Sequence, residues 1–231
     1  MQKIVILTGA GLSAESGLGT FRDVGGLWTQ YDLEEVATPE GFARDPVQVH
    51  AFYNARRANC RDAEPNVAHR ALARLQRAHG AEVLIVTQNV DDLHERAGSG
   101  AVWHMHGSLA RALCAACGHR WDAPEVTAAD DPCPACRAAA TRPDVVWFGE
   151  MPYLMEDIWT ALEAADLFVA IGTSGTVYPA AGFVEIAAEA GALTLELNLE
   201  PSETASAFDE VRQGPASVLV PAWVDEVLAQ R

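Results

Sequence analysis

Short, continuous apolar runs recur along the chain and predict strands that are buried on both faces of a sheet. Segments with a helical pattern separate many of these runs, at about 46–78 and at 155–165, 180–190 and 223–229. Strands that alternate with helices indicate an α/β fold, with a Rossmann-like parallel sheet and helices on both faces. The predicted strands lie at 3–8, 82–87, 101–104, 145–148, 167–171, 193–197 and 218–220.

Two segments interrupt this alternation and predict additions to the sheet. Residues 31–78 indicate a helical insert, and residues 109–144 combine four cysteines and several prolines with almost no large aliphatic side chains. A segment of that composition cannot bury a core of its own and needs a metal ion. We therefore expect a Rossmann-like domain from 1–30, 79–108 and 145–231, interrupted by the helical insert and a zinc-binding module.

The four cysteines of that module form two C-x-x-C pairs. Cys114 and Cys117 make the first pair, Cys133 and Cys136 make the second, and 15 residues separate the pairs. This spacing matches a zinc pattern, and each pair can present two thiolates to one tetrahedral ion. Four thiolates leave no open position, so the expected single Zn²⁺ is structural. A redox dithiol would need only one pair, and Cys60 is predicted to be a partly buried structural thiol.

The net charge of the chain limits the kinds of molecule that it is expected to bind. Its 231 residues carry a formal net charge of −16, which is unfavourable for binding nucleic acid or an anionic membrane. An acidic surface suits a basic protein segment, although acidity serves solubility equally well. No apolar run is long enough to cross a bilayer, and the N-terminus lacks the pattern of a signal peptide. We expect a cytoplasmic protein with neither nucleic acid nor membrane as its partner.

A glycine-rich turn after the first strand predicts a dinucleotide site. Its G-x-G-x-x-[G/A] pattern allows close approach of a pyrophosphate to a helix N-terminus, although an ordinary tight turn can match it too. A dehydrogenase would carry a ribose-binding acid after the next strand, whereas Asp32 and Glu34 follow no strand. The candidate residues are Gly9, Ala10, Gly11, Ser13 and Ala14 in the turn, with Gly172, Thr173, Ser174, Asn198, Leu199 and Glu200 at the ends of later strands.

A second group of polar side chains follows two other predicted strands. Gln88, Asn89 and Asp91 come directly after the strand at 82–87, and His106 follows the strand at 101–104. Ligands of open α/β sheets bind at the carboxyl ends of strands, and a histidine there is a candidate general base. Each of these groups taken alone could equally be a hydrogen-bonded structural side chain.

Taken together, these segments resemble the sirtuin family of NAD-dependent protein lysine deacylases, and the resemblance runs in order over nearly the whole chain. GAGLSAESG at 9–17 and Thr20-Phe21-Arg22 look like the cofactor loop of that family. TQNVD at 87–91 and HGS at 106–108 look like its catalytic motifs. The four cysteines and the segments 148–150, 172–174 and 198–200 complete the set.

The resemblance implies roles in catalysis and cofactor binding. His106 would be the general base that activates a hydroxyl of the nicotinamide ribose, whereas His104 would be structural. Asn89 would orient the ribose and water, Asp91 would hold the nicotinamide carboxamide, and Gln88 would contact the ribose. Cofactor contacts are also implied for Glu15, Thr20, Phe21, Trp28 and Ala216, and Arg22 would help to order the cofactor loop.

The resemblance also implies a substrate and a reaction. Phe148, Gly149 and Glu150 would pair their backbone with an extended acyl-lysine peptide, next to Val145. NAD would be consumed as a co-substrate, giving deacylated lysine, nicotinamide and O-acyl-ADP-ribose, and we expect the enzyme to act as a monomer. Three alternatives remain: mono-ADP-ribosyl transfer by the same site, an NAD-dependent dehydrogenase, and a non-catalytic zinc-ribbon binding module.

One helical segment points to the acyl group. Tyr53 and Arg56 are three residues apart and so share a helix face, where a hydroxyl and a guanidinium make a fork suited to a carboxylate. The pair resembles the sirtuin subgroup that removes succinyl and malonyl groups, in which a small residue widens the acyl pocket; Ala37 matches that residue. The alternative is a packed tyrosine beside a surface arginine. We expect activity on succinyl-lysine and malonyl-lysine in addition to acetyl-lysine.

Overall fold

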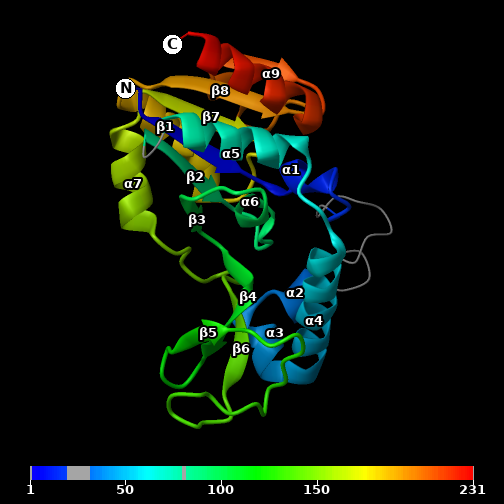
Figure 1. Ribbon diagram of the computed structural model, residues 1–231. Helices are drawn as coiled ribbons and strands as arrows, with labels where there is room; N and C mark the ends of the chain where they lie inside the picture. The colour runs from blue at the N-terminus through cyan, green and yellow to red at the C-terminus, as the bar shows by residue number, and fades with distance from the viewer. Residues whose placement is uncertain (1, 20–31, 80–81, 231) are drawn as a thin grey trace.

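A computed structural model describes residues 2–19, 32–79 and 82–230 (Figure 1). Its larger part is a six-stranded sheet in which every neighbouring pair is parallel, with the order β3-β2-β1-β7-β8-β9. Thr20, Phe21, Arg22 and Trp28, which the sequence suggested as cofactor contacts, lie outside the described residues. The strands are β1 (Ile4–Thr8), β2 (Val83–Thr87), β3 (Val102–His104), β7 (Leu167–Ile171), β8 (Leu193–Asn198) and β9 (Glu210–Gln213).

Helices cover both faces of this sheet. Successive side chains of a strand point to opposite faces, and every residue of β1 is buried. Ile4 and Ile6 pack on α5 and α9, while Val5 and Leu7 pack on α7 and α8. Figure 1 shows α5 and α9 side by side on one face. The helices of this part are α1 (Ala10–Ala14), α5 (Val67–His79), α6 (Leu93–Arg96), α7 (Met155–Glu163), α8 (Phe183–Glu189) and α9 (Ala216–Ala229), with short 3₁₀ turns at Ala180–Gly182 and Ala205–Ala207.

Among the described residues, the smaller part combines a three-stranded antiparallel sheet with three helices (Figure 1). Two helices begin where the sequence supplies both a cap and a proline. Thr38 accepts the Gly41 N–H before Pro39, and Asp45 accepts the Gln48 N–H before Pro46. The elements are α2 (Leu33–Val36), α3 (Pro39–Arg44), α4 (Pro46–Asp62), β4 (Gly107–Cys114), β5 (Arg120–Asp122) and β6 (Thr141–Val145), in the sheet order β5-β4-β6.

The structure corrects several predicted elements. The predicted strand at 218–220 is wrong, since these residues lie inside α9, and β9 was missed. The predicted strand at 145–148 is also wrong in its bounds: only Val145 lies in a strand, as the last residue of β6, which pairs with β4 in the smaller sheet. The helical pattern at 46–78 is two helices, and the second of them, α5, packs on α9 and on the six-stranded sheet. The range 31–78 assigned to the helical insert therefore extends too far by one helix.

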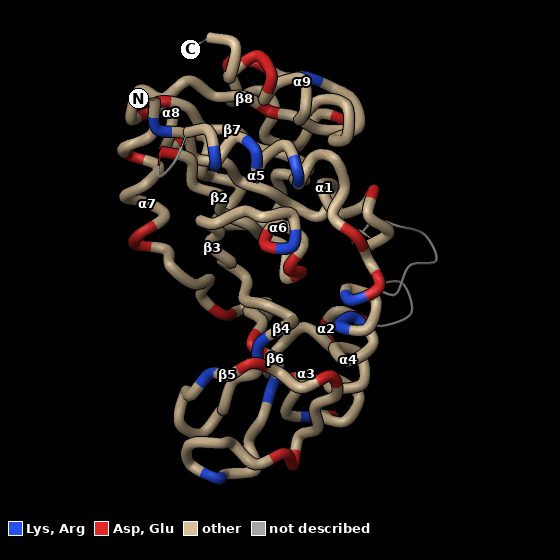
Figure 2. Tube along the Cα trace, viewed as in Figure 1, with Lys and Arg blue, Asp and Glu red and all other residues tan. Residues whose placement is uncertain are grey.

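No helix among the described residues is both long and apolar enough to cross a membrane. Figure 2 shows acidic and basic positions interspersed along the described trace of both parts. Acidic positions outnumber basic ones, since the sequence contains 32 acidic residues and 16 lysines and arginines.

Candidate active site

The loops that follow β2, β7 and β8 meet at one edge of the six-stranded sheet. Gln88 Nε2 donates to Thr173 Oγ1 at 2.9 Å, and Asn198 Nδ2 donates to the Thr173 carbonyl at 2.7 Å. The polar side chains predicted after separate strands are thus brought together, as expected for the carboxyl edge of a parallel sheet. Leu199 and Glu200 lie just beyond, both exposed, and Ser174 Oγ lies 2.8 Å from Thr176 Oγ1.

Gly9 and Gly11 in the β1–α1 turn have no room for a side chain, because the loop after β7 lies close to them. A Cβ added to Gly9 would lie 2.7 Å from the Gly172 carbonyl, and one added to Gly11 would lie 2.8 Å from Gly172 Cα. The Gly9 N–H donates to the Ile171 carbonyl and the Gly11 N–H to the Gly172 carbonyl. We expected free N–H groups facing a pyrophosphate, but these two amides are already satisfied within the fold. The Ser13 hydroxyl, which follows in α1, is likewise bonded within the fold.

Three buried side chains form a connected polar group beneath that turn. Asn89 Nδ2 donates to the Gly9 carbonyl at 3.1 Å and to Ser13 Oγ at 3.0 Å, and Ser13 Oγ donates to Asp91 Oδ2 at 3.0 Å. Burial raises the pKa of Asp91, against the opposing effect of hydrogen bonds from the Leu93 N–H and Ser13. Asn89 and Asp91 are thereby held in fixed orientations, with β1 and β2 both contributing to the site.

The two histidines of the H-x-H segment differ in their partners. His106 Nδ1 lies 3.1 Å from the Gln88 carbonyl, which can only accept, so Nδ1 carries the proton. Within the described part of the chain Nε2 has no partner, which leaves its lone pair available to a ligand. Burial lowers the pKa of His106, so the neutral form prevails at neutral pH. His106 is therefore equipped to act as a general base.

His104 is instead bonded at both ring nitrogens. Nδ1 lies 3.1 Å from the Asn89 carbonyl and Nε2 lies 2.8 Å from Glu95 Oε1. Burial opposes a charge on this ring, but the hydrogen bond and negative charge of Glu95 outweigh burial and raise the pKa of His104. Its nitrogens are occupied, so it is not available as a base.

Glu15 and Ala216 meet at the start of α9. The Glu15 carboxylate accepts the Ser217 N–H at 3.0 Å and also the Ser217 hydroxyl, and Ala216 is the first residue of that helix. An acid at a helix N-terminus is stabilising. Glu15 thus joins α9 to the turn after β1, and its carboxylate is already engaged.

Tyr53 and Arg56 lie together on α4, as predicted. The Tyr53 hydroxyl is buried and accepts from Trp147 Nε1 at 3.0 Å, while the Arg56 guanidinium carbon lies 5.5 Å from the centre of the Tyr53 ring. Burial lowers the pKa of Arg56 from its ordinary value, and the nearby Tyr53 and Asp91 oppose that effect. A partly buried guanidinium that neighbours Asp91 can receive a carboxylate close to the candidate catalytic residues.

The predicted peptide-binding segment adjoins this pair. The Phe148 N–H donates to the Ala37 carbonyl at 2.9 Å, and the Phe148 side chain is half exposed. Glu150 forms a bidentate pair with Arg142, at 2.8 and 2.9 Å, and also accepts the Trp147 N–H. The side chain of Glu150 therefore supports the segment from within, while Gly149, with a φ of +88°, makes the turn. Val145, in the same stretch, is buried at the end of β6.

Sequence reasoning did not identify Trp147 or Arg142. The Arg142 guanidinium carbon lies 3.5 Å from the centre of the Trp147 ring. The adjacency of Trp147 and Phe148 is a signal of a packed segment, but the Tyr53 hydroxyl that accepts from Trp147 Nε1 comes from a distant element. Trp147 links the Glu150 turn to Tyr53 on α4.

The four cysteines of the smaller part gather in one cluster. All four Sγ atoms lie within 4.8 Å of one another, with Cys114 3.6 Å from Cys136 and Cys117 3.8 Å from Cys133. A tetrahedral ion with Zn–S bonds of about 2.3 Å needs sulfurs about 3.8 Å apart, so the residues fit zinc. β4 starts beside His106 and ends at Cys114, a length of roughly 20 Å at the rise of a strand. The metal site is thus structural and distant from the histidine.

Two glycines with positive φ should respond differently to alanine. A Cβ on Gly107 (φ +82°) would lie 2.1 Å from the Asp144 carbonyl, whereas no described atom lies within 4 Å of one on Gly149. We expect Gly107→Ala to lower the free energy of unfolding by about 3 kcal/mol, since the backbone of β6 must move. Gly149→Ala should cost about 1 kcal/mol, from its backbone conformation alone. Denaturant unfolding of both variants checks this, and equal losses would contradict it.

Comparison with known proteins agrees with this geometry. The Sir2 family model matches residues 9–179. The NAD-dependent protein deacylase of Caulobacter vibrioides is 57% identical, with 100% of this chain and 98% of the relative covered; that of Escherichia coli strain K12 is 54% identical, with 98% and 82% covered.

Solved structures give the same result. A complex of a Sir2 homologue with NAD has a TM-score of 0.90 at 38% identity, covering 99% of this chain and 90% of that chain. A Sir2 protein bound to an acetylated peptide has a TM-score of 0.80 at 25% identity, covering 99% and 92%. With these matches extending over nearly the whole length, the chain belongs to the Sir2 family.

Proposed function

We propose that this chain is an NAD-dependent protein deacylase that removes acyl groups from lysine side chains. The observation that carries the proposal is the arrangement of His106, whose protonated Nδ1 is held by the Gln88 carbonyl while Nε2 stays available. The relatives at 57% and 54% identity are named NAD-dependent protein deacylases. The Ser13, Asn89 and Asp91 group supplies the polar contacts that a ribose and a carboxamide require.

In the proposed reaction NAD and the acyl-lysine peptide are both substrates. The acyl oxygen attacks the anomeric carbon of the ribose as nicotinamide leaves, and His106 accepts the proton of a ribose hydroxyl, which then attacks the acyl carbon. Asn89 orients the ribose and the water that completes the transfer, and Asp91 holds the carboxamide. The products are deacylated lysine, nicotinamide and O-acyl-ADP-ribose.

The direct test is incubation of the purified chain with NAD and a panel of acyl-lysine peptides. Nicotinamide should be released only when a peptide is present, and the mass of the peptide should fall by the acyl group. No release with any acyl peptide would overturn the proposal. A gain of ADP-ribose on the protein substrate would instead support mono-ADP-ribosyl transfer, which neither relative is named for.

The substrate is proposed to be a lysine-rich protein segment, bound by a monomeric and cytoplasmic enzyme. The net charge of −16 favours a basic partner over nucleic acid or an anionic membrane. An extended peptide is proposed to bind along residues 148–150, where Phe148 is exposed and Gly149 makes a turn.

The acyl chain is proposed to include succinyl and malonyl as well as acetyl groups. The buried Tyr53 and the partly buried Arg56 lie side by side near Asp91, and an acyl carboxylate in such surroundings needs a cationic partner. Ala37, whose small buried side chain adjoins the Phe148 segment, leaves the width that a longer acyl group requires.

The Arg56→Met variant should change the preference for the acyl group while the enzyme stays folded and active. We expect the ratio of kcat/KM for a succinyl peptide to that for a matched acetyl peptide to fall at least about tenfold, because a charge-assisted hydrogen bond is lost. Arg61→Met is the matched control, since Arg61 lies on the same helix but forms only an exposed ion pair with Glu125. A succinyl-to-acetyl ratio that Arg56→Met leaves unchanged would refute the carboxylate fork.

A further inference from the structure

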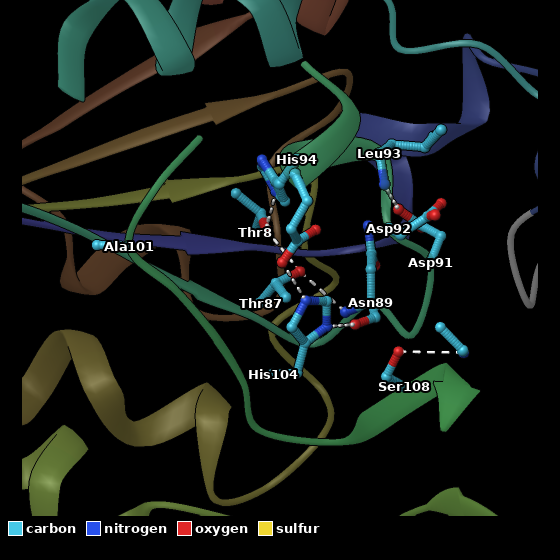
Figure 3. Close-up of polar contacts among 12 residues, drawn as sticks. Thr8, Thr87, Asn89, Asp91, Asp92, Leu93, His94, Ala101, His104 and Ser108 are labelled. Atoms are coloured by element: carbon cyan, nitrogen blue, oxygen red, sulfur yellow. Dashed lines mark hydrogen bonds and ion pairs between the residues drawn. The ribbon is translucent and has the colours of Figure 1, made fainter. Parts of the chain in front are cut away.

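The peptide groups of Asn89 are held by side chains at both ends. Its N–H donates to Thr87 Oγ1 at 3.0 Å, and its carbonyl accepts from His104 Nδ1 at 3.1 Å (Figure 3). Side chains that bind both backbone groups of one residue fix the direction in which its side chain leaves the backbone. In Asn89 that side chain reaches Gly9 and Ser13, at the centre of the site.

A buried series of hydrogen bonds supports Thr87. The Thr8 hydroxyl donates to Thr87 Oγ1 at 2.8 Å, so its oxygen is left to accept from His94 Nε2 at 3.1 Å. Thr8 and Thr87 are fully buried, and the His94 ring meets the His69 ring edge-on at 5.0 Å. Hydrogen bonds in such a dry environment are electrostatically strong and hold one arrangement.

A second series of hydrogen bonds supports His104, and both series start from the helix α6. Glu95 Oε1 binds His104 Nε2 at 2.8 Å, and Glu95 follows His94 on α6. The Leu93 N–H of that helix donates to Asp91 Oδ1 at 3.1 Å. Leu93, His94 and Glu95 of α6 thus provide two routes to Asn89 and a third to Asp91.

We propose that Thr87 and His104 are positioning residues for Asn89, and that α6 supports them through Thr8, His94 and Glu95. This inference rests on the proposed function, in which Asn89 orients ribose and water. Neither positioning residue needs to contact a substrate, because each acts through the backbone of Asn89. His104 therefore has a specific task beside His106, in addition to filling space.

Two matched pairs of variants test the proposal. Thr87→Val removes the acceptor of the Asn89 N–H at nearly constant shape, whereas Thr87→Ser keeps it. His104→Leu removes the donor to the Asn89 carbonyl, whereas His104→Asn supplies an amide donor near the position of Nδ1. We expect kcat for nicotinamide release to fall about tenfold in Thr87→Val and His104→Leu, as for loss of one hydrogen bond. KM for NAD should change less than threefold, and the Ser and Asn variants should recover most of kcat.

Thermal unfolding measured on the same samples separates positioning from stability. Thr8→Val, which leaves the Asn89 contact in place, should lower kcat about threefold and serves if Thr87→Val does not fold. A kcat within twofold of wild type in both Thr8→Val and His104→Leu would overturn the proposal, as would equal losses in each conservative and non-conservative pair. Wild-type enzyme that releases no nicotinamide would instead show that the proposed function itself is wrong.

Discussion

The His106→Asn variant is expected to lose deacylation by at least about 100-fold while remaining folded. An asparagine amide can still donate to the Gln88 carbonyl that His106 Nδ1 contacts at 3.1 Å, so the loop keeps its anchor. What disappears is the available Nε2, which we assign as the proton acceptor. The measurement is single-turnover formation of the deacylated peptide at saturating NAD and acyl peptide, because nicotinamide leaves before His106 accepts a proton. NAD affinity is measured separately.

His119→Ala is a suitable control for that variant. His119 is exposed in the zinc-binding module, and its ring stacks on Trp121 at 5.8 Å. Its removal should leave kcat within about twofold of wild type, as for a surface change. Comparable activity losses in the His106 and His119 variants would contradict the assigned base.

The pH profile gives an independent view of the same group. The base acts when neutral, and burial lowers the pKa of His106 below its ordinary value of 6.5. The acid limb of the rate should therefore have its midpoint below pH 6.5, and the rate should level off at higher pH, where His106 is neutral. His104 has a raised pKa, so an acid limb centred above 6.5 would point to His104 and away from His106.

Much of this site could be predicted from the sequence because parallel strands bring their carboxyl ends to one edge. That rule was sufficient to group Gln88, Asn89, Asp91 and Asn198 before any contact was known. The four cysteines were predictable from spacing alone, since a metal site demands a fixed set of ligands. Relations between loops were not predictable in this way. The close approach of Gly172 to Gly9 occupies amides that the pattern had assigned to a phosphate.

The wrong elements share a physical cause, which is that local pattern does not encode tertiary context. Ser217-Val218-Leu219-Val220 has the composition of a strand, but α9 begins just before it and packs on α5. β9 (Glu210–Gln213) has three polar residues out of four, because it lies at the sheet edge and is paired on one side only. The α5 helix was assigned to the insert because its apolar stripe does not say which surface it will cover.

Removal of zinc should unfold the smaller sheet and abolish activity, although the metal is far from His106. Cys114 and Cys133 are buried, so the cysteine cluster forms part of the interior of residues 109–144. Structural zinc contributes about 10–16 kcal/mol in small zinc-binding peptides, so its loss exceeds what this module can withstand. Loss of order in β4 would reach Gly107, which is paired with Val145 directly beside His106.

The Cys133→Ser variant, with Cys60→Ser as its control, tests whether loss of zinc unfolds the smaller sheet. Cys60 is also buried, but it lies on α4 and outside the four-sulfur cluster. Wild type and Cys60→Ser should each bind one zinc per chain, whereas Cys133→Ser should lose the ion, amide protection in β4–β6 and turnover. Protection in β1 and β7 should persist, because the core around Ile6 and Val169 contains no residue of the module. A zinc-free chain that keeps amide protection in β4 would show that side-chain packing alone holds the module, and a metal analysis on the same sample excludes residual ion.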